Sequence, residues 1–422
     1  MESTAIPIGE GICLRHSQTE KFTTRIYHIL LRRPLRRLEV TANAALPGIL
    51  KRGCAAYPDN RRIACKAEEL FGALLEASVV KKGEEQLLQF CLETTRDVPP
   101  EEAIAFLCEI LLRPVAENGA FRAEYAAGET ENLRRAIEAR QNDKREYARL
   151  RCLEGMCANE PFGIYGDGFA ADLPALTPEG LWARYQDVLT DAAIELVTVG
   201  DMDARQLARI FTEKLTMPRG AVFEPISAAD YKDGAKKERD CAEGMDIAQA
   251  KLCLGLRAGV PPTGQAYCDL LVANAVFGGG ADSKLFKQVR EKESLCYYVQ
   301  SVLYRYKSIL LVEAGVAPKD LDRAKALIQK QLAAMQAGDI GAEALDKAKK
   351  ALVKHMSGLA DSPSAIADFA LSQALAGEAE AGLDDMAVRI AAVTEKSCVK
   401  AFADVALTMC YRLTPQEGGR GE

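Results

Sequence analysis

Histidine is scarce in this chain. Among 422 residues only His16, His28 and His355 occur, and no two of them lie within four positions of each other. A metalloprotease helix of the HExxH or HxxEH kind needs two histidines on one helical face, because both must reach the same zinc ion. The scarcity therefore excludes such a helix from this chain, and it leaves few bases for a cysteine nucleophile.

Other common site motifs are also missing. The thirteen cysteines are spread singly without a CxxC pair, and the closest two, Cys152 and Cys157, have no histidine nearby. This pattern disfavours a zinc knuckle and favours small core side chains. The glycine run from Phe277 to Gly280 is followed by Lys284 but lacks the Gly-Lys-Ser/Thr order of a phosphate-binding loop. We expect it to end a helix in a tight turn.

Long apolar runs and an excess of positive charge are absent as well. No stretch approaches the roughly 18 uninterrupted apolar residues of a membrane span, and the first residues lack the basic start and apolar core of a signal peptide. Lys and Arg number 54 against 60 Asp and Glu, which gives a net charge of −6. This balance offers no electrostatic footprint for nucleic acid or anionic lipid. We expect a cytoplasmic protein that binds neither nucleic acid nor membrane.

What the sequence does contain is an internal repeat. A strand pattern that starts at 28 recurs at 253, a helix start near 41 recurs at 264, and a strand start near 86 recurs at 308. These displacements are nearly equal and indicate a duplicated unit of about 200 residues. Each unit is expected to hold two strands, a helix pair, two more strands, several helices and a closing strand, at Ile194–Val199 in the first unit and Leu407–Leu413 in the second.

Hairpins and grouped helices, in place of a regular strand and helix alternation, predict an α+β protein with mostly antiparallel sheets. Helical stretches at 121–156 and 341–393 are expected to cover one face of each sheet. The region 217–244 carries several prolines and glycines and a charge run, which predicts a linker with room for a short strand. The expected domains are therefore residues 1–216 and 245–422.

One segment, FGGGADSKLFKQVREKESLCYYVQS at 277–301, is more specific. Its glycine turn, helix, Arg290 and Leu-Cys-Tyr entry into a strand resemble the second-half signature of the pitrilysin/insulinase-like metallopeptidases, which include mitochondrial processing peptidase. In that family an Arg and a Tyr seven residues apart reach from the non-catalytic half to the substrate. Arg290 and Tyr297 have this spacing, so the resemblance implies that they bind substrate. Both side chains donate hydrogen bonds that suit a carbonyl or an oxyanion.

The resemblance extends over most of the chain, including the segment LPGILKRGCAAYPDNRRIACKAEELFGALLEASVV. It places the first zinc-binding histidine of the family at Ala44, the base glutamate at Pro47 and the second histidine at Gly48. The third ligand, a glutamate seven residues after another glutamate that matches Glu129, falls at Ala136. Zinc catalysis needs three protein ligands and a base, so these four replacements remove the hydrolytic chemistry of the family from this chain.

The resemblance then implies a non-catalytic subunit of a heterodimeric zinc metallopeptidase, without a cofactor of its own. In two-protein members of the family one chain carries HxxEH and zinc and the other carries the Arg and Tyr, and this sequence resembles the second kind. The implied partners are a paralogous HxxEH subunit and an unstructured peptide, which could add as a strand to a sheet edge inside a clamshell of two halves. Two alternatives stay open: a stand-alone peptide-binding or scaffold protein, and a homodimer with unrelated chemistry.

Overall fold

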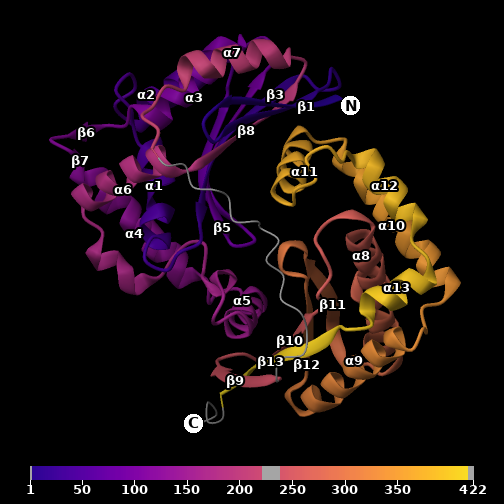
Figure 1. Ribbon diagram of the computed structural model, residues 1–422. Helices are drawn as coiled ribbons and strands as arrows, with labels where there is room; N and C mark the ends of the chain where they lie inside the picture. Colours follow the sequence, from indigo (N-terminus) through magenta and orange to yellow (C-terminus); the bar gives the residue numbers. More distant parts are fainter. Residues whose placement is uncertain (1, 221–237, 417–422) are drawn as a thin grey trace. The chain divides into compact units, whose positions relative to one another are not determined.

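The computed structural model describes residues 2–220 and 238–416 (Figure 1). The chain packs into two compact units, and each unit gathers three separate stretches of sequence. The first unit contains Met1–Ala139, Ile164–Ala228 and Leu359–Gly382, and the second contains Arg140–Gly163, Ala229–Gly358 and Leu383–Glu422. Most of the predicted linker, 221–237, lies outside the described residues, but a strand begins at Arg239 within its last part.

The first unit is built on a sheet of six strands among the described residues. These are β1 (Glu2–Gly9), β2 (Ile12–Gln18), β3 (Thr24–Pro34), β4 (Leu74–Lys82), β5 (Glu85–Thr95) and β8 (Ala193–Gly200), in the order β1-β2-β8-β3-β5-β4. The β2 and β8 strands run parallel and the other neighbours run antiparallel. Because side chains alternate along a strand, Tyr27, Ile29 and Phe90 share one face and join the main core of this unit.

The helices of the first unit pack against this sheet or against one another. They are α1 (Val40–Lys51), α2 (Asn60–Glu69), α3 (Pro100–Leu112), α4 (Ala123–Ala139), α6 (Pro178–Asp191), α7 (Ala204–Lys214) and α11 (Pro363–Leu375), and a two-strand hairpin of β6 (Ala116–Glu117) and β7 (Ala120–Phe121) precedes α4. The α3 helix shows how sequence sets the ends. Pro100 occupies its first position and two glutamates fill its first turn, where a missing N–H is harmless and negative charge is favourable.

The second unit has a sheet of five strands among the described residues. These are β9 (Arg239–Met245), β10 (Ala250–Arg257), β11 (Cys296–Tyr304), β12 (Ile309–Val316) and β13 (Ala406–Pro415), in the order β11-β12-β10-β13-β9. Its helices are α5 (Lys144–Met156), α8 (Gly264–Gly278), α9 (Leu321–Gln336), α10 (Ala342–Leu359), α12 (Leu383–Ala392) and α13 (Glu395–Phe402). Within the described part of the chain, none of the helices combines the length and apolar character that crossing a bilayer requires.

The two sheets repeat one topology. The order β2-β8-β3-β5-β4 in the first unit corresponds to β9-β13-β10-β12-β11 in the second, and the parallel pair is in the same place, β2 with β8 and β9 with β13. The predicted α+β class, the mostly antiparallel sheets and the duplication are therefore confirmed. The predicted closing strands are also confirmed, as β8 and β13.

The sequence did not predict that the units exchange helices. The α5 helix, from the first half of the chain, packs on β10 and β13, whereas α11, from the second half, packs on β2, β3 and β8. Both helices bury an apolar stripe, and a stripe does not say which of two similar sheets it will cover. The compact units are thus not simple halves of the sequence, and the boundaries at 216 and 245 stay a prediction for the repeat itself.

Candidate functional site: degenerate metal positions and an exposed arginine and tyrosine pair

The α1 helix carries the positions that the resemblance assigns to two histidines and a glutamate. Ala44 is half-buried, Pro47 is buried inside the helix, and Gly48 is half-buried. None of these side chains offers a nitrogen or carboxylate ligand. Among residues 2–220 and 238–416, no three His, Cys, Asp or Glu side chains form a group that could hold a metal ion. The residues present therefore do not fit a catalytic zinc site.

An ion pair lies beside the second of the histidine positions. A Cβ atom on Gly48 would come within 2.5 Å of the Oε2 atom of Glu129, which belongs to α4. Arg52 forms an ion pair with the same carboxylate, and Asn132 donates to its Oε1 atom over 3.1 Å. Glu129 is thus the α4 carboxylate that faces Gly48. Ala136, which the resemblance assigns to the third ligand, is exposed two turns further along α4, and its assignment stays a prediction.

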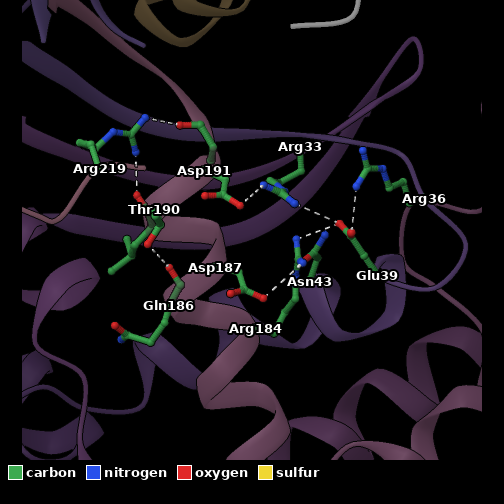
Figure 2. Close-up of polar contacts among 12 residues, drawn as sticks. Arg33, Arg36, Glu39, Asn43, Arg184, Gln186, Asp187, Thr190, Asp191 and Arg219 are labelled. Atoms are coloured by element: carbon green, nitrogen blue, oxygen red, sulfur yellow. Dashed lines mark hydrogen bonds and ion pairs between the residues drawn. The ribbon is translucent and has the colours of Figure 1, made fainter. Parts of the chain in front are cut away.

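A polar network fixes the start of α1 (Figure 2). The carboxylate of Glu39 accepts contacts of 3.3, 3.3 and 2.9 Å from Arg33, Arg36 and Arg184. Arg184 also donates through Nε to the side-chain oxygen of Asn43 over 2.7 Å. Burial alone would raise the pKa of Glu39, but the guanidinium groups of Arg184 and Arg33 outweigh burial and lower it. This network positions the helix rather than a substrate, because its members are occupied with one another.

Arg290 lies in a π-helical turn, Phe286–Lys292, that follows α8. The Arg290 side chain is exposed, and its guanidinium carbon stands 4.6 Å from the ring centre of Phe286. An aromatic face attracts a cation at this distance, so the ring limits where the guanidinium can point. Single π turns inside helices are frequent at functional sites.

Tyr297 occupies a β-bulge at the start of β11. In the pairing with β12, Cys296 faces Val316 and Tyr298 faces Gly315, so Tyr297 is the extra residue. Tyr298 packs where Gly315 leaves room for its ring, whereas the side chain of Tyr297 is 76% exposed. A bulge redirects a side chain out of the regular alternation. The structure therefore presents both predicted substrate-binding residues at the surface of one unit.

A groove of about 510 Å³ runs beside Arg290. One wall is formed by the five consecutive β11 residues 298–302, and another by the glycine run Gly278–Gly280. The β11 strand is an edge strand of its sheet, so its outer backbone groups have no strand neighbour among the described residues. Gly279 caps the carboxyl end of α8, which confirms the predicted role of the glycine run as a helix end. Tyr298, and not Tyr297, belongs to the lining of the groove.

The sequence reasoning missed three residues of these sites. These residues are Arg52, Phe286 and Gly315. An aromatic residue four positions before an arginine on a helix is a usable signal, because the two side chains share a face. No comparable local signal marks Arg52 or Gly315, because each acts on a residue from a different segment of the chain.

Comparisons with known proteins identify the family of this chain. A family model described as the inactive domain of M16 peptidases matches residues 175–352. The chain is 30% identical, over 420 residues and 97% of both proteins, to the "Probable inactive metalloprotease YmfF" of Bacillus subtilis. It is 33% identical to the "Uncharacterized zinc protease YmxG" of the same organism over 107 residues, which cover 25% of this chain and 26% of that relative.

Solved structures share the whole architecture. A conserved protein from Enterococcus faecalis is similar with a TM-score of 0.90 and 25% identity, over 98% of this chain and 99% of the other. A peptidase M16 inactive domain from Pseudomonas fluorescens has a TM-score of 0.81 and 16% identity over 100% of both chains, which shows a shared fold. Together with the similarity to YmfF over nearly the full length, these matches show that the chain belongs to the pitrilysin/insulinase-like M16 peptidase family, as a member of the inactive type.

Proposed function

We propose that this chain is the non-catalytic subunit of a heterodimeric zinc metallopeptidase. A paralogous partner would carry the HxxEH helix and the zinc ion, and this chain would contribute substrate contacts. One observation carries the proposal: Arg290 is exposed beside the edge strand β11, and Tyr297 is exposed at the start of this strand. The resemblance assigns the metal positions of the same chain to Ala44, Pro47 and Gly48. Such a chain would hold a peptide, and the zinc ion that activates water would come from the partner.

The groove at β11 suits an unstructured peptide. An extended chain can add to an exposed strand edge through main-chain hydrogen bonds, so binding needs no particular peptide sequence. Five successive β11 residues line the groove, and Gly280 leaves open space where a larger residue would add a side chain. A peptide strand along β11 would pass Arg290, which lines the same groove.

Arg290 and Tyr297 would then act on a peptide carbonyl in the partner's active site. A guanidinium and a phenol are both donors, and a donor aimed at a developing oxyanion stabilises the transition state more than the ground state. The stacking of Arg290 on Phe286 would reduce the reorientation needed when the substrate arrives. Both residues would be substrate-binding groups, with the bond-breaking chemistry in the partner.

Reconstitution with a partner tests this proposal. The chain would be coexpressed with an HxxEH protein of similar length from its own genome, copurified, and assayed for hydrolysis of unstructured peptides. We expect activity from the complex and none from this chain alone. Arg290→Ala and Tyr297→Phe should reduce kcat by roughly 10-fold to 1,000-fold, because an oxyanion donor contributes about 2.7 to 4 kcal/mol and a positioning hydrogen bond about 0.5 to 1.5 kcal/mol.

Lys292→Ala is the matched control, since Lys292 is an exposed cation in the same π-helical turn. This variant should keep the wild-type rate. Equal rates for wild type, Arg290→Ala and Tyr297→Phe in intact complexes would refute the site assignment. Hydrolysis by the chain alone, abolished by a mutation in this chain, would refute the subunit role.

A stand-alone peptide-binding protein is the second candidate. The observation in its favour is that the β11 edge and its groove lie within one unit, so that peptide capture by itself needs no second chain. Fluorescence anisotropy with a labelled unstructured peptide separates the two. Tight binding by the purified chain, together with failure of any HxxEH protein to copurify from the native host, would favour the stand-alone role.

A further inference from the structure

A buried charge cluster lies in the second unit, around the carboxylate of Glu160. Arg257 at the end of β10 is 1% exposed, and its Nη2 atom pairs with Oε1 of Glu160. The ammonium group of Lys307, whose side chain is fully buried, lies 3.0 Å from Oε2 of the same carboxylate. One carboxylate thus serves two buried cations.

The guanidinium group of Arg257 has more hydrogen-bond donors than Glu160 accepts. Its Nη2 atom meets Glu160 and also lies 3.6 Å from the Sγ atom of Cys157. Its Nη1 atom is buried and has no hydrogen-bond partner among the described residues. An unsatisfied buried donor is unfavourable, and more so on a charged group. A negatively charged acceptor beside Nη1 would supply the missing hydrogen bond and would offset part of the buried positive charge.

A cavity of about 340 Å³ adjoins this cluster, and Arg257 and Glu160 belong to its lining. Arg239 and Asn159 also line it, and both are exposed side chains that can donate hydrogen bonds. Met156 supplies an apolar wall. A second carboxylate of the lining, Glu238, pairs with Lys325 over 2.6 Å.

We propose that this cavity binds a small organic monocarboxylate. A carboxylate accepts hydrogen bonds from guanidinium groups readily, and the lining offers it Nη1 of the buried Arg257 and the guanidinium of the exposed Arg239. The short apolar tail of the ligand would lie against Met156. The carboxylates of Glu160 and Glu238 disfavour a doubly charged ligand such as phosphate, because the second negative charge would be repelled within a few ångströms.

The site is separate from the proposed peptidase role. Its lining shares no residue with the groove beside Arg290, so that either proposal can fail alone. The experiment is calorimetric titration of the purified full-length chain with sodium butyrate, at constant ionic strength held with sodium chloride, and repeated with sodium phosphate. We expect saturable binding of one butyrate per chain and weaker binding of phosphate.

Variants then locate the site. Arg239→Met should weaken butyrate binding roughly tenfold or more, because a charge-assisted hydrogen bond to the ligand is lost. Since Nη1 of Arg239 also donates to the backbone oxygen of Gly155 over 3.1 Å, thermal unfolding of this variant is compared with that of the wild type. Arg323→Met is the matched control, since Arg323 is an exposed arginine of the same unit that pairs with Glu293, and it should bind as wild type does. Absence of saturable butyrate binding, unchanged binding by Arg239→Met, or tighter binding of phosphate than of butyrate would each overturn the proposal.

Discussion

Replacing Gly48 by alanine tests the arrangement at the degenerate metal position. In an ordinary helix interior this change stabilises a protein, because glycine is about 1 kcal/mol less favourable than alanine. Here the new Cβ atom would lie 2.5 Å from Oε2 of Glu129 and 3.1 Å from its Cδ atom. The carboxylate would have to move, and Arg52 and Asn132 hold it in place.

The two effects have opposite signs, and their sizes decide the outcome. Moving the carboxylate sacrifices hydrogen bonds to a charged group, which contribute about 1.5 to 3 kcal/mol. Subtracting the helical gain of about 1 kcal/mol leaves a net destabilisation of roughly 0.5 to 2 kcal/mol for Gly48→Ala. For a unit of this size the midpoint of thermal unfolding should fall by about 1 to 8 °C.

Urea unfolding and thermal scans followed by circular dichroism measure this difference. Gly128→Ala is the matched control, because Gly128 lies inside α4 and its new Cβ atom would stand 3.6 Å from Arg52, an ordinary contact. This control should be stabilised by about 0.5 to 1 kcal/mol. In a Glu129→Ala background, Gly48→Ala should also become stabilising. Stabilisation by Gly48→Ala in the otherwise wild-type protein would refute the proposed contact.

Three further predictions concern metal, buried charge and pH. The purified chain should retain no stoichiometric zinc after dialysis, as measured by elemental analysis, and one tightly held zinc that survives replacement of all three histidines would contradict the family alignment. Glu160→Gln should destabilise the chain by about 3 to 5 kcal/mol in urea unfolding, because two buried cations lose their carboxylate, whereas Glu293→Gln, at a partly exposed pair, should change stability by less than about 1 kcal/mol. Burial lowers the pKa of His28 to about 4, below the value of about 6.5 for the unfolded chain, so its contribution of roughly 3 kcal/mol is complete above pH 6.5 and is lost as the pH falls towards 4. His28→Gln should flatten this part of the stability profile, His355→Gln at an exposed site should not, and equal profiles for the two variants would contradict the burial argument.

Periodicity made much of the fold predictable. The strands β3, β5 and β12 and the helices α1 and α8 begin within a few residues of their predicted places, because alternation and helical spacing are local properties of a chain with one buried face. The duplication was visible because equivalent elements recur at a nearly constant displacement. The inactive type of the family was implied by the resemblance, which assigns the metal positions to Ala44, Pro47 and Gly48, because none of these residues can be a metal ligand.

The exposure of Arg290 and Tyr297 could not be predicted from the sequence. The family resemblance implied a shared role for Arg290 and Tyr297, but their exposure comes from a π-helical turn and a β-bulge. A bulge depends on how two strands meet, and here Gly315 on β12 accommodates Tyr298 and leaves Tyr297 as the extra residue. Such register effects involve residues that are distant in the chain.

The sequence by itself determined the class of fold, the repeat and the family, since each of these depends on residue types at fixed spacings. The tertiary structure alone decided which sheet α5 and α11 cover, that Glu129 and Arg52 meet beside Gly48, and that Arg257 borders a cavity with a free donor. The physical reason is that amphipathic stripes and charged side chains do not specify their partners locally. The sheet that a helix covers and the partner that a charged side chain contacts are decided only when segments about a hundred or more residues apart pack together.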